Sequence, residues 1–184
     1  WFETPIDRPV RFLDLCTGSG CLGIITALTF PESTGVLADL ESGACQVARD
    51  NVGFHQVDDR LEVIQSDGFD GLSEDTFDVI ICNPPYVDAE DMATLPPEFQ
   101  KEPTVALASG NDGLMLVRRL LGQAADWLAS DGIMVLEVGN TWGLLDREIT
   151  SRTGESVQWC EFEFGGHGVC VLSKQELNTL YSAF

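Results

Sequence analysis

The sequence predicts a doubly wound α/β fold, with a mostly parallel seven-stranded sheet and an antiparallel hairpin at its C-terminal edge. Short apolar runs of strand length alternate with helix-like runs from residue 10 to residue 152. After them, two apolar segments are joined only by Gly165-Gly166-His167-Gly168, a link short enough for a hairpin. With 184 residues, we expect a single domain, residues 1–184, with one buried core.

The apolar runs and their turn residues give the bounds of each expected element. Strands are expected at residues 10–16, 34–39, 61–66, 77–82, 131–138, 156–163 and 168–173. Helices are expected at residues 21–30, 42–53, 112–130 and 143–152. We expect Asp131-Gly132 to end the third of these helices, because glycine commonly follows a helix C-terminus.

A glycine-rich turn follows the first expected strand. Asp14 ends the strand, Cys16-Thr17 lead into the turn, and Gly18 and Gly20 allow tight turning and close approach of a ligand to the backbone. A strand, a glycine-rich turn and a helix in succession form the plan of a nucleotide-binding crossover. The acidic residue four positions before the first glycine resembles the S-adenosylmethionine loop of class I methyltransferases. A carboxylate there is useful beside the cationic α-amino group of that cofactor.

Two further carboxylates stand where the next strands end. Asp39, with Glu41 as a close rival, can accept hydrogen bonds from both ribose hydroxyls of a nucleoside. Asp67, in Ser66-Asp67-Gly68-Phe69, can accept from an adenine amino group, with Phe69 or Leu40 packing on the ring. In open α/β sheets ligands bind beyond the carboxyl ends of the strands, so these side chains are expected to share one site.

The segment Asn83-Pro84-Pro85-Tyr86 follows the fourth expected strand. Each proline pushes the residue before it to extended geometry, and neither has an N–H group. The loop therefore offers two fixed acceptors, the Asn83 side-chain oxygen and the Pro84 carbonyl, which suit the two hydrogens of an –NH2 group. Tyr86 adds an aromatic face for a flat substrate or a cation.

These motifs together resemble the HemK/PrmB family of protein glutamine N5-methyltransferases over nearly the whole chain, and the PrmB branch in particular. The resemblance is carried by residues 13–21 (LDLCTGSGC), 83–92 (NPPYVDAEDM), 102–113 (EPTVALASGNDG), 137–140 (EVGN) and 161–169 (EFEFGGHGV). It implies a class I methyltransferase fold, S-adenosylmethionine as the cofactor and a protein glutamine as the methyl acceptor. For the PrmB branch, that glutamine belongs to the third protein of the large ribosomal subunit.

The resemblance also implies which residues act. The catalytic set is Asn83, Pro84, Pro85 and Tyr86. The cofactor-binding set is Asp14, Cys16, Thr17, Gly18, Gly20, Asp39, Leu40, Asp67, Gly68, Phe69 and Asn83. The family has an N-terminal helical domain that is absent here, so we expect the sequence to be a piece of a longer protein. The chain also has Asp39-Leu40-Glu41-Ser42-Gly43 where the family usually has Asp-Ile-Ser-Pro.

Charge and composition limit the partners. Thirty acidic residues face ten basic ones, a net charge of −20, which repels nucleic acid and suits a basic protein acceptor. A solvated acidic surface of a salt-adapted organism explains the same charge. No apolar run is long enough to span a membrane. The six cysteines lack metal-binding spacing, so we expect no metal and a cytoplasmic protein.

Some assignments remain open at this point. Asn-Pro-Pro-Tyr is shared with DNA and RNA amino-methyltransferases, although no basic target-recognition region is visible. A release-factor glutamine methyltransferase would share all but the PrmB-like segments. A third alternative is a chain that binds cofactor weakly and turns nothing over. His55 and His167 are expected in surface and turn positions, and three tryptophans in packing roles: Trp127, Trp142 and Trp159.

Overall fold

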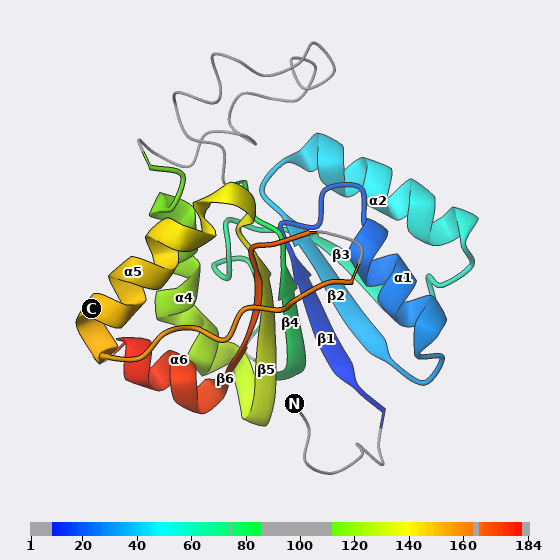
Figure 1. Ribbon diagram of the computed structural model, residues 1–184. Coiled ribbons are helices and arrows are strands. Elements are labelled where there is room, and N and C mark those ends of the chain that lie inside the picture. The colour runs from blue at the N-terminus through cyan, green and yellow to red at the C-terminus, as the bar shows by residue number, and fades with distance from the viewer. Residues whose placement is uncertain (1–8, 74, 86–111, 164–165, 182–184) are drawn as a thin grey trace. The chain divides into compact units, whose positions relative to one another are not determined.

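The computed structural model describes residues 9–73, 75–85, 112–163 and 166–181 (Figure 1). Its strands form a six-stranded sheet in the order β3-β2-β1-β4-β5-β6. The chain divides into two compact units. One comprises residues 1–82 and 126–134, and the other comprises residues 83–125 and 135–184.

The first unit holds a block of parallel strands and their crossover helices (Figure 1). Its elements are β1 (Arg11–Leu15), α1 (Cys21–Thr29), β2 (Thr34–Asp39), α2 (Ser42–Phe54), β3 (Leu61–Gln65) and β4 (Phe77–Cys82). The strands end level with one another, because Leu15 is aligned with both Ala38 and Cys82. The residues that follow these strands are therefore brought to one edge of the sheet.

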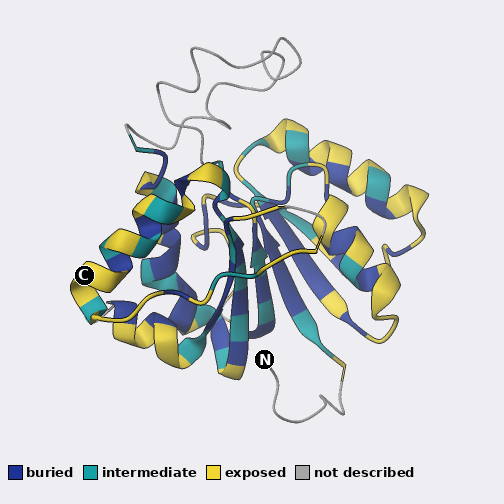
Figure 2. Cartoon of the chain, in the orientation of Figure 1, coloured by how far each residue is buried: buried dark blue, intermediate teal, exposed yellow. Residues whose placement is uncertain are grey.

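The core of this unit lies between the sheet and its two helices. Phe12, Ile24, Leu37, Val52 and Leu61 belong to one buried cluster, drawn dark blue in Figure 2. They come from three strands and both helices, so burying their side chains holds the crossovers against the sheet. The cluster thereby fixes where the turns after β1 and β2 emerge.

Strand β3 forms one edge of the sheet. Gly35 donates to the Arg60 carbonyl and Ser66 donates to the Asp39 carbonyl, so the even-numbered residues of this segment face β2. The carbonyl of Val63 therefore faces away from β2, and the Arg49 guanidinium of α2 donates to it at 3.1 Å. A side chain thus occupies part of the edge that another strand could otherwise pair with.

The second unit contains most of the C-terminal half. The elements of the C-terminal half are α4 (Met115–Trp127), β5 (Leu128–Glu137), the 3-10 turn η3 (Gly139–Thr141), α5 (Trp142–Thr153), β6 (Val169–Ser173) and α6 (Lys174–Tyr181). Residues 126–134, which include the end of α4 and most of β5, belong to the first unit. Arg118 of α4 donates to Glu148 of α5 at 2.7 Å and to Asp112 at 2.7 Å. The hydrogen bond from Arg118 lowers the pKa of Asp112. This three-residue network ties α4, α5 and the residues before α4 together.

The expected seventh strand at residues 156–163 is not present as a strand among the described residues. Trp159 makes a single antiparallel bridge with Cys170, and Cys160 donates to the Val169 carbonyl at 2.8 Å. The hairpin direction is therefore as predicted, but the ladder is short. Residues 161–163 are all exposed, Phe162 included, so the end of this segment lacks the alternating burial that sustains a strand.

Two other boundaries differ from expectation. Helix α4 ends at Trp127, and Asp131-Gly132 lies within β5. A Cβ at Gly132 would lie 2.9 Å from the Phe77 carbonyl oxygen, so this glycine permits a close backbone approach and does not end a helix. The sequence expectations also missed α6. Its signal was the Ser173-x-x-Glu176 capping box, in which each side chain bonds the other residue's backbone N–H.

Among the described residues, no helix combines the length and apolar character needed to cross a membrane.

The packing of Gly35 generates a stability prediction. A Cβ there would lie 2.3 Å from the Phe12 ring, which is fully buried, so Gly35→Ala must displace that ring. We expect a loss of about 1–3 kcal/mol in the free energy of unfolding, measured by urea denaturation. Gly43→Ala is the matched control, because it lies in α2 with open space around it and should stabilise by about 0.5–1 kcal/mol. Equal effects of the two substitutions would contradict the packing argument.

Candidate functional site

Asp14 is the buried anchor of the turn after β1. Its side chain is 1% exposed, and its Oδ2 accepts hydrogen bonds from the Thr17 hydroxyl at 2.5 Å and from the Gly23 N–H at 2.8 Å. The first bond closes the turn, and the second holds the first turn of α1. The carboxylate therefore fixes how the glycine-rich segment leaves the strand.

Burial has a measurable electrostatic consequence at Asp14. Desolvation raises its pKa to about 6, against the lowering effect of the hydrogen bonds from Thr17 and Gly23. The nearby charge of Asp39 raises the pKa further. The anchor is thus ionised at neutral pH at the expense of stability.

Asp39 stands at the end of β2 and is half-buried. Its Oδ2 accepts the Gly18 N–H at 2.8 Å, and its Oδ1 accepts the Glu41 N–H at 2.9 Å. A carboxylate offers about four acceptor sites, so two sites can still receive hydroxyl hydrogens. The rival residue Glu41 contributes its backbone to this arrangement and precedes α2 as its N-terminal cap.

The glycine-rich turn leaves space beside its backbone. Gly18 has φ +57° and Gly20 has φ +84°, conformations that side-chain-bearing residues rarely adopt. A Cβ at Gly18 would have no heavy atom within 4 Å, so the backbone there borders open space. Cys16 also has a positive φ of 60°, which is strained for a residue with a side chain. The turn thus combines a strained backbone with open space beside it, and both features are typical of ligand-binding loops.

The residues after β3 differ in how exposed they are to solvent. Gly68 is buried with φ +60°, and Asp67 is exposed. Phe69 is 1% exposed and stacks on Trp127 with ring centroids 5.5 Å apart, so one face of its ring is covered within the core. Leu40 is 46% exposed and remains the more accessible of the two apolar residues expected beside an adenine ring.

The segment after β4 carries the expected acceptor residues. Asn83 is exposed, Pro84 is buried and Pro85 is half-buried. The exposed amide is thus backed by a buried proline, which limits the backbone conformations open to it. Tyr86 lies outside the described residues.

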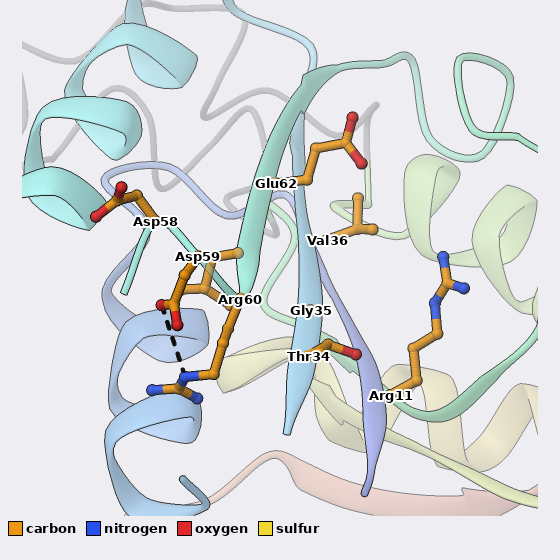
Figure 3. Close-up of a pocket in the computed structure, with 9 residues that line it drawn as sticks. Arg11, Thr34, Gly35, Val36, Asp58, Asp59, Arg60 and Glu62 are labelled. Atoms are coloured by element: carbon orange, nitrogen blue, oxygen red, sulfur yellow. Dashed lines mark ion pairs between the residues drawn. The ribbon is translucent and has the colours of Figure 1, made fainter. Parts of the chain in front are cut away.

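A cavity of about 300 Å³ lies at the opposite ends of the same strands (Figure 3). Arg11 and Thr34 begin β1 and β2, and Arg60 directly precedes β3, so the cavity borders the amino ends of the strands. Arg60 donates to the carbonyls of Ala27 and Ser33, which is a structural role. This cavity is therefore separate from the candidate site.

The sequence did not reveal how the candidate site is held together. The hydroxyl of Thr17 and the N–H of Gly23 support Asp14, and the N–H of Gly18 supports Asp39. The sequence predicts Thr17 only as a ligand contact and assigns no role to Gly23. The sequence pattern that could have indicated these roles is a hydroxyl residue, Thr17, three positions after Asp14 and a glycine, Gly23, nine positions after it. Among the described residues, no cluster of side chains could hold a metal ion.

Comparison with solved structures identifies the class of fold. A methyltransferase from Pyrococcus furiosus superimposes with a TM-score of 0.66 at 21% identity, over 94% of this chain and 78% of that one. The sheet order and the glycine turn after β1 agree with this likeness. The protein therefore has the fold of class I methyltransferases.

The particular family follows from the sequence. The family model described as methyltransferase small domain matches residues 3–112, and the chain belongs to this family. Two similar proteins are named ribosomal protein uL3 glutamine methyltransferase. The one from Francisella tularensis is 40% identical over 179 residues, covering 97% of this chain and 56% of the relative. The one from Bordetella pertussis is 39% identical over 181 residues, covering 97% and 59%. The chain thus spans less than two thirds of each relative.

The raised pKa of Asp14 predicts a specific pH dependence. Its folded pKa of about 6 exceeds the unfolded value of 3.8, so the native state holds the proton more tightly. The stability contributed by the protonated carboxyl is therefore present below about pH 4 and is lost as the pH rises through about 6.

Asp14→Asn tests this effect, because its amide oxygen can still accept from Thr17 and Gly23. Between pH 4 and pH 7, the variant should gain about 2 kcal/mol in free energy of unfolding relative to the wild type. Urea denaturation across this range measures the difference. If the difference in free energy of unfolding between the variant and the wild type did not change with pH, the proposed titration of Asp14 would be ruled out.

Proposed function

We propose that this chain transfers a methyl group from S-adenosylmethionine to the side-chain amide nitrogen of a protein glutamine. The observation that carries the proposal is the exposed Asn83 followed by Pro84-Pro85 directly after β4, in a chain of the methyltransferase small domain family. The named function of the two bacterial relatives supports the glutamine as the acceptor.

The residues after β1 and β2 fit the cofactor. Open space beside Gly18 leaves room for the methionine part, and Asp39 retains acceptor sites for ribose hydroxyls. The exposed Leu40 offers an apolar surface to the adenine ring. S-adenosylmethionine would supply a methyl group bonded to a sulfonium, with a neutral leaving group. The role of Asp14 in this proposal is to hold the turn, with any effect on the α-amino group exerted through its charge.

The acceptor residues then have a defined task. A glutamine amide nitrogen is a poor nucleophile, because its lone pair is delocalised into the carbonyl. The Asn83 side-chain oxygen and the Pro84 carbonyl each accept one amide hydrogen, which orients the nitrogen and stabilises the positive charge that grows on it. S-adenosylhomocysteine would be the neutral leaving group, and the methylated nitrogen would then release one of its two hydrogens as a proton to solvent. Pro85 is assigned to pack against the glutamine side chain, and the sequence motif assigns the same role to Tyr86. Positioning of this kind can supply roughly 7–11 kcal/mol of the barrier.

Asn83 and Asp39 should separate catalysis from cofactor binding. We expect Asn83→Ala to lower kcat by about 10²-fold or more, while affinity for S-adenosylhomocysteine stays within about twofold. Asp39→Ala should do the reverse, with the larger loss in S-adenosylhomocysteine affinity measured by calorimetry. If Asn83→Ala reduced both quantities equally, the loop would have a structural role instead.

The acceptor protein we propose is the third protein of the large ribosomal subunit, and we propose a cytoplasmic location for the reaction. The net charge of −20 supports a basic acceptor of this kind, because opposite charges steer association. A release factor is the alternative acceptor, since the Asn83-Pro84-Pro85 chemistry would be the same.

Intact-mass analysis of both purified acceptors, incubated with the chain and S-adenosylmethionine, tests this choice. We expect one added methyl group on the ribosomal protein and none on the release factor. Methylation of the release factor alone would move the assignment to the sister enzyme. No methylation of either, with S-adenosylhomocysteine still bound, would contradict the proposal that this chain by itself methylates either protein.

A further inference from the structure

The loops after β5 and before β6 are locked together by their backbones. Gly168 has φ +79°, and a Cβ there would lie 2.3 Å from the Gly139 carbonyl oxygen. The Val138 N–H donates to the Gly168 carbonyl at 2.7 Å, and the Thr141 hydroxyl donates to the Val138 carbonyl at 2.7 Å. Only glycine fits at position 168, so Gly168 and the residues directly after β5 form one closely packed support.

This support presents a polar pair to solvent. His167 Nε2 lies 2.8 Å from Asn140 Oδ1, and both side chains are exposed. When Nε2–H donates to Asn140, the neutral imidazole keeps Nδ1 as an acceptor, and the Asn140 amide keeps its two donors. The pair can therefore accept from and donate to the backbone of a bound polypeptide.

Exposed aromatic side chains lie near the pair in the chain, Trp142 two residues after Asn140 and Phe162 five residues before His167. Trp142 is 40% exposed and Phe162 is 48% exposed. Trp142 packs edge-on against Trp159 at 5.7 Å, and the Trp159 indole N–H donates to Asp146 at 3.1 Å. Phe162 lies within 3.4 Å of a Cβ position at Gly166, beside His167 in the chain. Partly exposed aromatic residues on a rigid support are typical of binding surfaces.

The charge around these residues indicates the partner. Glu161 and Glu163 are exposed on either side of Phe162. Aromatic faces and carboxylates both attract cations, so the surface suits lysine or arginine side chains. A nucleic acid or an acidic peptide would be repelled.

The position of the surface relates it to the acceptor residue. β4 and β5 are neighbours in the strand order of the sheet. Asn83 follows β4, and Gly139-Asn140 follow β5, within the same compact unit. Ligands of open α/β sheets bind at such carboxyl ends.

We propose that Asn140, Trp142, Phe162 and His167 form a docking surface for a basic polypeptide segment that flanks the methylated glutamine. This inference rests on the proposed function and assigns to it a specificity surface. The aromatic side chains contact the lysine and arginine side chains of the bound segment, and the acidic residues attract their charges. The His167–Asn140 pair forms hydrogen bonds with the backbone of the bound segment.

The test measures peptide binding separately from methyl transfer. The probe is a synthetic peptide with a central glutamine between lysine and arginine residues, and its counterpart carries glutamate at those positions. We expect only the basic peptide to bind, with affinity that weakens as salt is added. Binding of both peptides, or of neither, would overturn the proposal.

Phe162→Ala and His167→Ala should each weaken binding of the basic peptide, Phe162→Ala by roughly tenfold, with S-adenosylhomocysteine affinity and Tm unchanged. His167→Gln should retain part of the lost affinity, because its amide can still bond Asn140. The matched control is Phe54→Ala, an 80% exposed aromatic residue in the other unit, which should have no effect.

In methylation assays, Phe162→Ala should raise the KM for the basic peptide and leave kcat within about twofold. Peptide affinity within twofold of wild type in both Phe162→Ala and His167→Ala would overturn the docking proposal. A basic peptide that binds through these residues but is never methylated would instead overturn the proposed function, so the two failures are distinguishable.

Discussion

The buried carboxylate of Asp14 is the constraint on which the first unit depends. Burying a charge is costly, and here hydrogen bonds from the Thr17 hydroxyl and the Gly23 N–H offset only part of that cost. Both bonds come from the segment that links β1 to α1. The same interaction therefore shapes the turn, starts the helix and leaves the backbone at Gly18 accessible. Without the hydrogen bonds to Asp14, the strands would still end at the same level, but the turn between β1 and α1 would lose its fixed conformation.

A second carboxylate only one strand away plays a different part. Asp39 is half-buried and braces the turn through the Gly18 N–H, while part of its acceptor capacity remains. Its charge disfavours ionisation of Asp14, so the two acidic groups share an unfavourable interaction. A cation bound nearby would relieve that repulsion. The repulsion between buried Asp14 and half-buried Asp39 is therefore an unfavourable interaction that binding of a positively charged ligand would reduce.

Much of the fold could be predicted because its signals are local. The parallel strands and the first two helices follow from apolar periodicity, and the turn follows from Gly18 and Gly20. Errors arose where tertiary contacts decide. Gly132 resembled a helix stop but serves close packing against β4, and residues 156–163 have strand-like composition without a strand's burial. Asn83 could be recognised from its prolines, whereas the His167–Asn140 pair depends on a contact between glycine backbones distant in sequence.

The Arg49 contact at the sheet edge bears on how copies of this chain behave together. An open edge strand can recruit an identical strand, and β3 has an apolar centre in Val63-Ile64. Arg49 occupies one backbone acceptor there, and Glu62 places an exposed negative charge beside it. Two such edges would each present a blocked hydrogen-bond position and an exposed carboxylate. The net charge of −20 also keeps copies of the chain apart, and dissolved salt weakens that repulsion, whereas the hydrogen bond from Arg49 to the edge does not depend on the net charge.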